Sequence, residues 1–145
     1  MELLKDIAVD LNMYESLEFV KTELDDKYFK EFIEVYIKIK NDDRLNKYKL
    51  LKADCMDHNA AGFDFSVNKK SEFEINHCWV IFFITYEDKF YNNMKSYTIQ
   101  SFNKHTLGPD MDVVKIYDNL PDALNCLFDE LKKRDKLLED NYKFY

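Results

Sequence analysis

The chain has 145 residues and a formal net charge of −7 at neutral pH, and 46% of its residues are hydrophobic. A chain of this length buries roughly two thirds of its unfolded surface, so we expect one domain, residues 1–145. The hydrophobic content is too high for a typical disordered protein. The acidic balance also makes nucleic acid a poor partner, because binding it requires cations that neutralise phosphates.

The expected compartment follows from the cysteines and from the apolar runs. Three cysteines without framework spacing indicate free thiols in a reducing compartment. Charged residues interrupt the first twelve positions, which does not fit a signal peptide. The longest uninterrupted apolar run, residues 78–84, is far shorter than the about 20 residues that cross a bilayer. We therefore expect a cytoplasmic protein that does not enter a membrane.

Helical spacing dominates the first third of the chain. Apolar residues at helical intervals predict a helix over 3–11, and Ser16 is the predicted cap of a second helix whose apolar stripe includes Leu17 and Val20. Residues 26–40 fit a third helix, although residues 33–39 also alternate in the manner of a strand. Residues 44–55 are ambiguous, and we predict a helix there too.

The pattern changes to a period of two after residues 59–62. Alternation and turn residues predict four strands, near residues 63–67, 72–87, 94–102 and 111–117. Asn119 and Pro121 then begin a closing helix, as a cap followed by a proline in the first turn. The expected fold class is α+β, with N-terminal helices, an antiparallel meander of about four strands and a C-terminal helix.

The strand predicted over 72–87 is apolar on both faces. We expect its odd positions to share a core face with the odd positions of the neighbouring strands, because these are apolar as well. On the even face, Val80, Phe82 and Ile84 form an apolar centre with polar positions around it. Either one of the predicted helices covers this centre, or it is an interface with a partner or with a second copy in a homodimer.

The negative charge is concentrated at the N-terminus. Residues 1–34 hold ten acidic side chains and four lysines, a net charge of −6. Such a face favours a basic protein partner, because opposed fields raise the rate of encounter. The residues predicted to bind this partner are Glu15, Glu18, Glu23, Asp25 and Asp26. The simpler alternative is that these acids only face solvent.

The cysteines and histidines could build two kinds of reactive site. Cys55, His58, His77 and Cys78 could supply four zinc ligands, but adjacent residues of a strand point to opposite faces, so we expect no metal and no cofactor. A Cys–His pocket built from Cys55 with His58 or His105 would make the chain a small enzyme. No phosphate-binding loop accompanies either possibility, and we assign no catalytic residue.

In size, acidity and mixed layout, the whole chain resembles the small acidic immunity proteins of bacterial toxin–immunity systems. The resemblance implies a cytoplasmic, non-catalytic protein that neutralises a cognate toxin, often a basic nuclease, by occluding it. The alternatives are the small Cys/His enzyme and a homodimeric scaffold subunit.

Reversal of Glu15, Glu18 and Glu23 to lysine is expected to weaken binding of a basic partner, because it removes the opposed field, while the fold survives. Calorimetric titration or a pull-down measures the affinity, and circular dichroism checks the fold. Unchanged affinity would contradict a role for these acids.

Overall fold

The computed structural model describes residues 4–66, 78–103 and 113–142, and these form an α+β arrangement of N-terminal helices, an antiparallel sheet and a C-terminal helix. The predicted fold class is confirmed, and the sheet has five strands. The elements are α1 (Leu4–Ile7), α2 (Leu11–Glu23), α3 (Asp26–Lys40), β1 (Lys49–Asp57), β2 (Ala60–Ser66), β3 (Cys78–Asp88), the 3-10 turn η1 (Lys89–Tyr91), β4 (Met94–Asn103), β5 (Val113–Tyr117) and α4 (Leu120–Tyr142).

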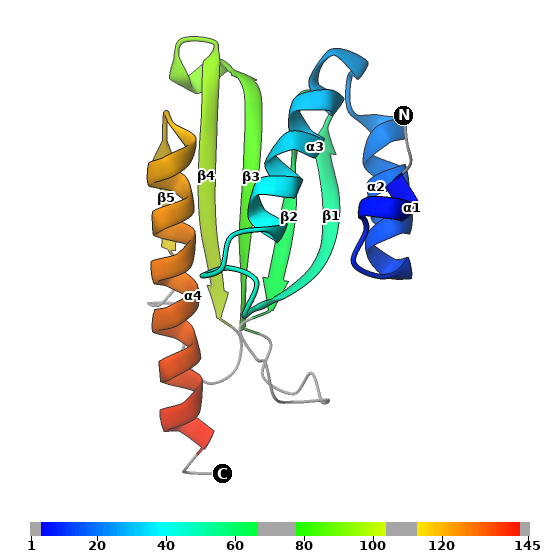
Figure 1. Ribbon diagram of the computed structural model, residues 1–145. Helices are drawn as coiled ribbons and strands as arrows, with labels where there is room; N and C mark the ends of the chain where they lie inside the picture. The colour runs from blue at the N-terminus through cyan, green and yellow to red at the C-terminus, as the bar shows by residue number, and fades with distance from the viewer. Residues whose placement is uncertain (1–3, 67–77, 104–112, 143–145) are drawn as a thin grey trace.

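The strands form a meander in the order β1-β2-β3-β4-β5, and every neighbouring pair is antiparallel. In Figure 1, α3 and α4 lie in front of the sheet, and α1 and α2 lie to the side of β1. One face of the sheet therefore receives helices, and the second face is turned away from them.

The helix predicted over 44–55 is wrong, because residues 49–57 form the edge strand β1. The strand pairs with β2, and its register shifts between Leu50 and Lys52 and again between Cys55 and Asp57. Each bulge interrupts the alternation of apolar and polar residues that identifies a strand. The pairing with β2, which the local pattern does not reveal, decides the conformation here.

The start of α2 is also different from the prediction, because Asp10 caps this helix and Ser16 lies inside it. The Asp10 carboxylate accepts a hydrogen bond from the backbone N–H of Met13, at 2.8 Å. At α4, the predicted cap is confirmed: the Asn119 side-chain oxygen accepts a hydrogen bond from the Asp122 N–H, at 2.9 Å. Both are ordinary side-chain caps of free helical N–H groups.

Helix α2 closes the outer edge of β1. The Ala53 N–H donates to the Ser16 hydroxyl at 2.9 Å, and the Asn12 side-chain amide donates to the Leu51 carbonyl at 2.5 Å. These backbone groups would otherwise be free to pair with another strand. The mid-helix position of Ser16 thus serves the edge of the sheet.

The core face of the sheet was predicted incorrectly. In the antiparallel register, Phe63 pairs with Phe82 and Phe65 with Val80, so odd positions of β2 share a face with even positions of β3. Val80, Phe82 and Ile84 are fully buried in the core. The alternative in which the protein's own helices cover this apolar centre therefore holds, and these three side chains are not available as a surface interface.

A row of aromatic rings joins α3 to the middle of the sheet. The rings of Phe32 and Phe63 stack with centroids 4.7 Å apart, and the row continues from Phe63 to Phe82 and from Phe82 to Tyr97 at 6.5 and 6.2 Å. All four side chains lie in the core, and the first three are fully buried. Offset aromatic pairs of this kind add to the gain from burial.

Replacement of Phe63 by alanine is expected to lower the free energy of unfolding by about 3–5 kcal/mol, because it removes a buried ring and leaves a cavity. Urea denaturation measures the change. In the control variant Phe19→Ala, the ring that is lost is 48% exposed on α2, and the expected cost is about 1 kcal/mol or less. Equal losses in the two variants would contradict the central role of the row.

Candidate functional site

The face of the sheet away from the helices carries exposed apolar side chains. Phe83 of β3 is half-buried there, in cross-strand pairing with Thr98 of β4, which in turn pairs with Ile116 of β5. Ile116 is 54% exposed, and Val114 on the same face of β5 is 60% exposed. An antiparallel sheet can expose one face to water, but large aliphatic side chains are unusual on that face.

A groove of about 590 Å³ runs over this face. Its middle is apolar or weakly polar, and acids stand at the end formed by the β1–β2 and β3–β4 turns. The residues that line it are Asp57, Asn59, Ala60, Phe83, Thr85, Glu87, Asp88, Lys89, Phe90, Thr98, Gln100, Val114 and Ile116. We call this surface the open-face groove.

The turn between β3 and β4 projects Phe90 at the rim of the groove, with 99% of its surface exposed. The Asp88 carboxylate holds this turn, accepting from the Phe90 N–H at 2.9 Å and from the Ser96 hydroxyl at 2.7 Å. Asn92 and Asn93 complete the turn with φ of 55° and 58°, a conformation that asparagine adopts more readily than most residues. The ring of Phe90 is therefore carried on a hydrogen-bonded turn.

The acidic end of the groove is held together by backbone contacts. The Asp25 N–H donates to the His58 carbonyl at 2.8 Å, which joins the α2–α3 connection to the β1–β2 turn. The Asn59 side chain donates to the Glu87 carbonyl at 3.1 Å, which joins the same turn to the end of β3. These segments meet at the top of Figure 1.

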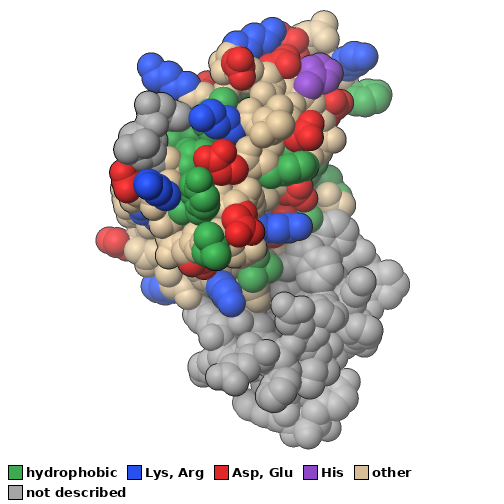
Figure 2. All heavy atoms as spheres, turned by 90° about the vertical axis from the view of Figure 1, so that its right-hand side faces the viewer, with side chains coloured by type: hydrophobic (Ala, Val, Ile, Leu, Met, Phe, Trp, Pro, Cys, Tyr) green, Lys and Arg blue, Asp and Glu red, His purple; other side chains and the backbone are tan. Residues whose placement is uncertain are grey.

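The predicted acids are not all brought together. Asp25 lies at the acidic end, and Glu23 is close enough to affect the Cys55 thiol, whereas Glu15 and Glu18 lie nearer the middle of α2. Figure 2 shows the side of the molecule that carries α1 and α2, with acidic, basic and hydrophobic side chains interspersed. The excess of negative charge in the N-terminal sequence does not form a patch of one sign on this side.

The proposed Cys–His pair is not assembled by Cys55 and His58. The Cys55 thiol donates to the Asp57 carbonyl at 3.0 Å, while the His58 imidazole pairs with the Asp57 carboxylate at 2.8 Å. Burial, with the nearby carboxylates of Glu23, Asp54 and Asp57, raises the pKa of the Cys55 thiol. A nucleophilic cysteine needs the opposite shift.

Residues 77 and 105, both histidines, and the side chain of Cys78 lie outside the described part of the structure. Among the described residues, no three side chains of His, Cys, Asp or Glu gather as a metal site would require. No helix in the described ranges is both long enough and apolar enough to cross a membrane.

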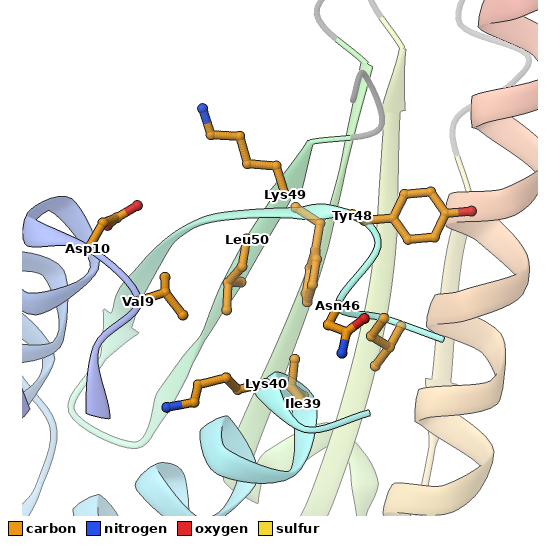
Figure 3. Close-up of a pocket in the computed structure, with 10 residues that line it drawn as sticks. Val9, Asp10, Ile39, Lys40, Asn46, Tyr48, Lys49 and Leu50 are labelled. Atoms are coloured by element: carbon orange, nitrogen blue, oxygen red, sulfur yellow. The ribbon is translucent and has the colours of Figure 1, made fainter. Parts of the chain in front are cut away.

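A second, smaller pocket of about 240 Å³ lies between the α1–α2 connection, the end of α3 and the start of β1. Figure 3 shows Val9, Ile39 and Leu50 at its walls. The ammonium group of Lys40 and the hydroxyl of Tyr36 both donate to the Ile7 carbonyl, each at 2.8 Å. These two hydrogen bonds hold the end of α1 against α3. Of the two lysines that line this pocket, Lys40 is thus already used to hold α1.

No protein-family model matches the chain, and neither the curated proteins nor the solved structures compared with it gave a significant match.

Sequence reasoning missed the open-face groove because it assigned the wrong face of β3 to the core. Odd-numbered residues of β2 pair with even-numbered residues of β3, so residues of opposite parity share a face in these two strands. The alternation of Val114 and Ile116 around Lys115 was visible in the sequence, yet nothing in it told which side the helices cover.

The raised pKa of Cys55 predicts slow alkylation at neutral pH, because only the thiolate reacts. The pH midpoint of its reaction with iodoacetamide is expected to lie above that of the same cysteine in the urea-unfolded chain. Peptide mapping by mass spectrometry follows this residue separately from the other two cysteines. A midpoint below the unfolded value would indicate an activated thiol and revive the enzyme alternative.

Proposed function

We propose that this chain is a non-catalytic binding protein, and that it inhibits a basic protein partner by covering it with the open-face groove. In this proposal it acts in the cytoplasm as an immunity protein, and its partner is a cognate toxin such as a basic nuclease. The observation that carries the proposal is the exposed apolar surface of Val114, Ile116 and Phe90 beside a groove with an acidic end.

The apolar part of the groove has the composition of a protein interface. Interfaces between proteins bury aromatic and aliphatic anchors at their centre and keep polar groups around them. Phe83 and Ile116 form such a centre here, Thr85 and Gln100 stand beside it, and Phe90 projects from the rim. Removing these side chains from water would contribute about 25 cal/mol for each Å² of apolar surface covered.

The charges at the groove favour a basic partner. Asp57, Glu87 and Asp88 line its end, and Lys89 is the one lysine among its lining residues. The whole chain, with these residues included, has a net charge of −7. A basic protein would be attracted over a distance of about 10 Å at moderate ionic strength, and binding should weaken as salt is added.

The small-enzyme alternative has less support among the described residues. A nucleophile needs a base within hydrogen-bonding distance and donors for the developing charge. Cys55 instead donates to a backbone carbonyl, and His58 is exposed and paired with Asp57. The hydrogen bonds of Cys55 and His58 therefore stabilise the β1–β2 turn and do not form a catalytic dyad.

The variant Ile116→Lys is expected to weaken binding by about 100-fold, because it places a cation in the apolar centre against a basic partner. The probe is the protein encoded next to this chain in its genome, since toxin and immunity genes lie together, and calorimetry measures the affinity. The matched control is Ile37→Lys, which changes a 36% exposed isoleucine on α3 and should leave binding intact.

Failure of the neighbouring protein to bind the unaltered chain would overturn the immunity proposal. Equal effects of the two isoleucine variants would show that a partner binds elsewhere. Thermal unfolding of each variant confirms that a lost interaction reflects the surface and not the fold.

A further inference from the structure

The two edges of the sheet are treated differently by the rest of the chain. At β1, side chains of Ser16 and Asn12 occupy backbone groups of Ala53 and Leu51. At β5, the inner side pairs with β4, and no described residue forms a backbone hydrogen bond to its outer side. Within the described ranges, β5 thus ends the sheet, and its outer N–H and C=O groups have no backbone partner there.

The side chains of β5 protect this edge only through one inward-pointing lysine. Natural edge strands are commonly blunted by an inward-pointing or freely exposed lysine, a proline or a bulge. Here Val114 and Ile116 are more than half exposed, and no bulge is present between β4 and β5. Lys115 is the one cation of the strand, and its ammonium lies 3.6 Å from the Glu130 carboxylate of α4.

Glu130 is a fixed partner for that lysine. The carboxylate is 4% exposed, and it also accepts from the Ser101 hydroxyl at 3.2 Å. The Nε atom of Arg134, which is buried, lies 3.7 Å from it. Lys115 is therefore drawn toward the helix side of the sheet, away from the open-face groove.

Negative charge collects where β5 ends. Asp118 follows the strand directly, and Asp122 lies in the first turn of α4. The side-chain amide of Asn119 donates to both carboxylates, each at 2.9 Å, so it holds the two together. Both acids are exposed, and neither has a cation among the described residues.

We infer that β5 is the docking edge for an extended segment of the basic partner, which adds a sixth strand to the sheet. This inference rests on the proposed function and names how the same surface would be used. Backbone hydrogen bonds to β5 supply affinity, as in other strand-addition complexes. Apolar side chains of the segment lie beside Val114 and Ile116, and its lysine or arginine residues lie toward Asp118 and Asp122.

A second copy of this chain is the less suitable occupant. An antiparallel pair of β5 strands centred on the middle of the element would place Lys115 opposite the same lysine of the other copy, and like charges directly opposite are unfavourable. Two chains of net charge −7 would also repel each other. A basic segment avoids the second difficulty, because its charge is opposite to that of the whole chain.

The probe for the test is a ten-residue peptide of alternating valine and lysine, compared with a twin of the same sequence whose backbone nitrogens are all methylated. The first peptide is expected to slow amide hydrogen exchange at residues 113–117, measured by nuclear magnetic resonance. The affinity of the methylated twin should be at least about tenfold lower, because its backbone cannot donate hydrogen bonds to β5. Ile116→Lys should abolish the protection, and Ile37→Lys should preserve it.

Equal binding of the two peptides, or protection confined to residues outside β5, would overturn strand addition. If Ile116→Lys still weakened binding of the neighbouring protein in that case, the open-face groove would remain the proposed binding surface. Only the inference about the edge of β5 would then be wrong. A dimer in sedimentation that Ile116→Lys dissociates would overturn the inference in favour of a second copy. Protection of β5 without binding of the neighbouring protein would support the edge and count against the immunity role.

Discussion

The stacking of Phe32 on Phe63 is the contact on which the arrangement depends. It joins α3 to the centre of the sheet, and the row continues through Phe82 to Tyr97, so one interaction fixes the helix across three strands. Because these rings all lie on one side, that side must be the core. The remaining face of the sheet is then left for water or for another molecule, and its character decides what the protein can do.

That remaining face combines two properties that usually occur apart. It carries large exposed aliphatic groups on β5, which favour contact with another protein, and acids at one end, which favour a partner of opposite charge. Gly62 contributes to its shape, since a Cβ atom there would lie 2.4 Å from that of Phe83, and only glycine permits β2 to approach β3 so closely. The groove is thus a product of strand packing as well as of surface composition.

The order of elements could be predicted from the sequence, because the helical stripe of α3 and the cap of α4 are local signals. The conformation of β1 could not, since two bulges interrupt the alternation of apolar and polar residues along it. The candidate site was missed for a related reason. Which face of β3 becomes the core depends on its register with β2. Because odd-numbered residues of β2 pair with even-numbered residues of β3, the even positions of β3 lie in the core. The net charge follows from the sequence alone, whereas the distribution of charge over the surface depends on the fold.

The closure of the β1 edge by Ser16 and Asn12 has a consequence for stoichiometry. A sheet with two free edges can add strands at both ends, and repeated addition leads to open-ended polymers. With the β1 edge held by a helix, copies of this chain can add to one another only through β5, so their addition stops at a pair. The geometry therefore favours a discrete one-to-one assembly, and it guards a molecule with exposed aliphatic strands against becoming the template of a fibre.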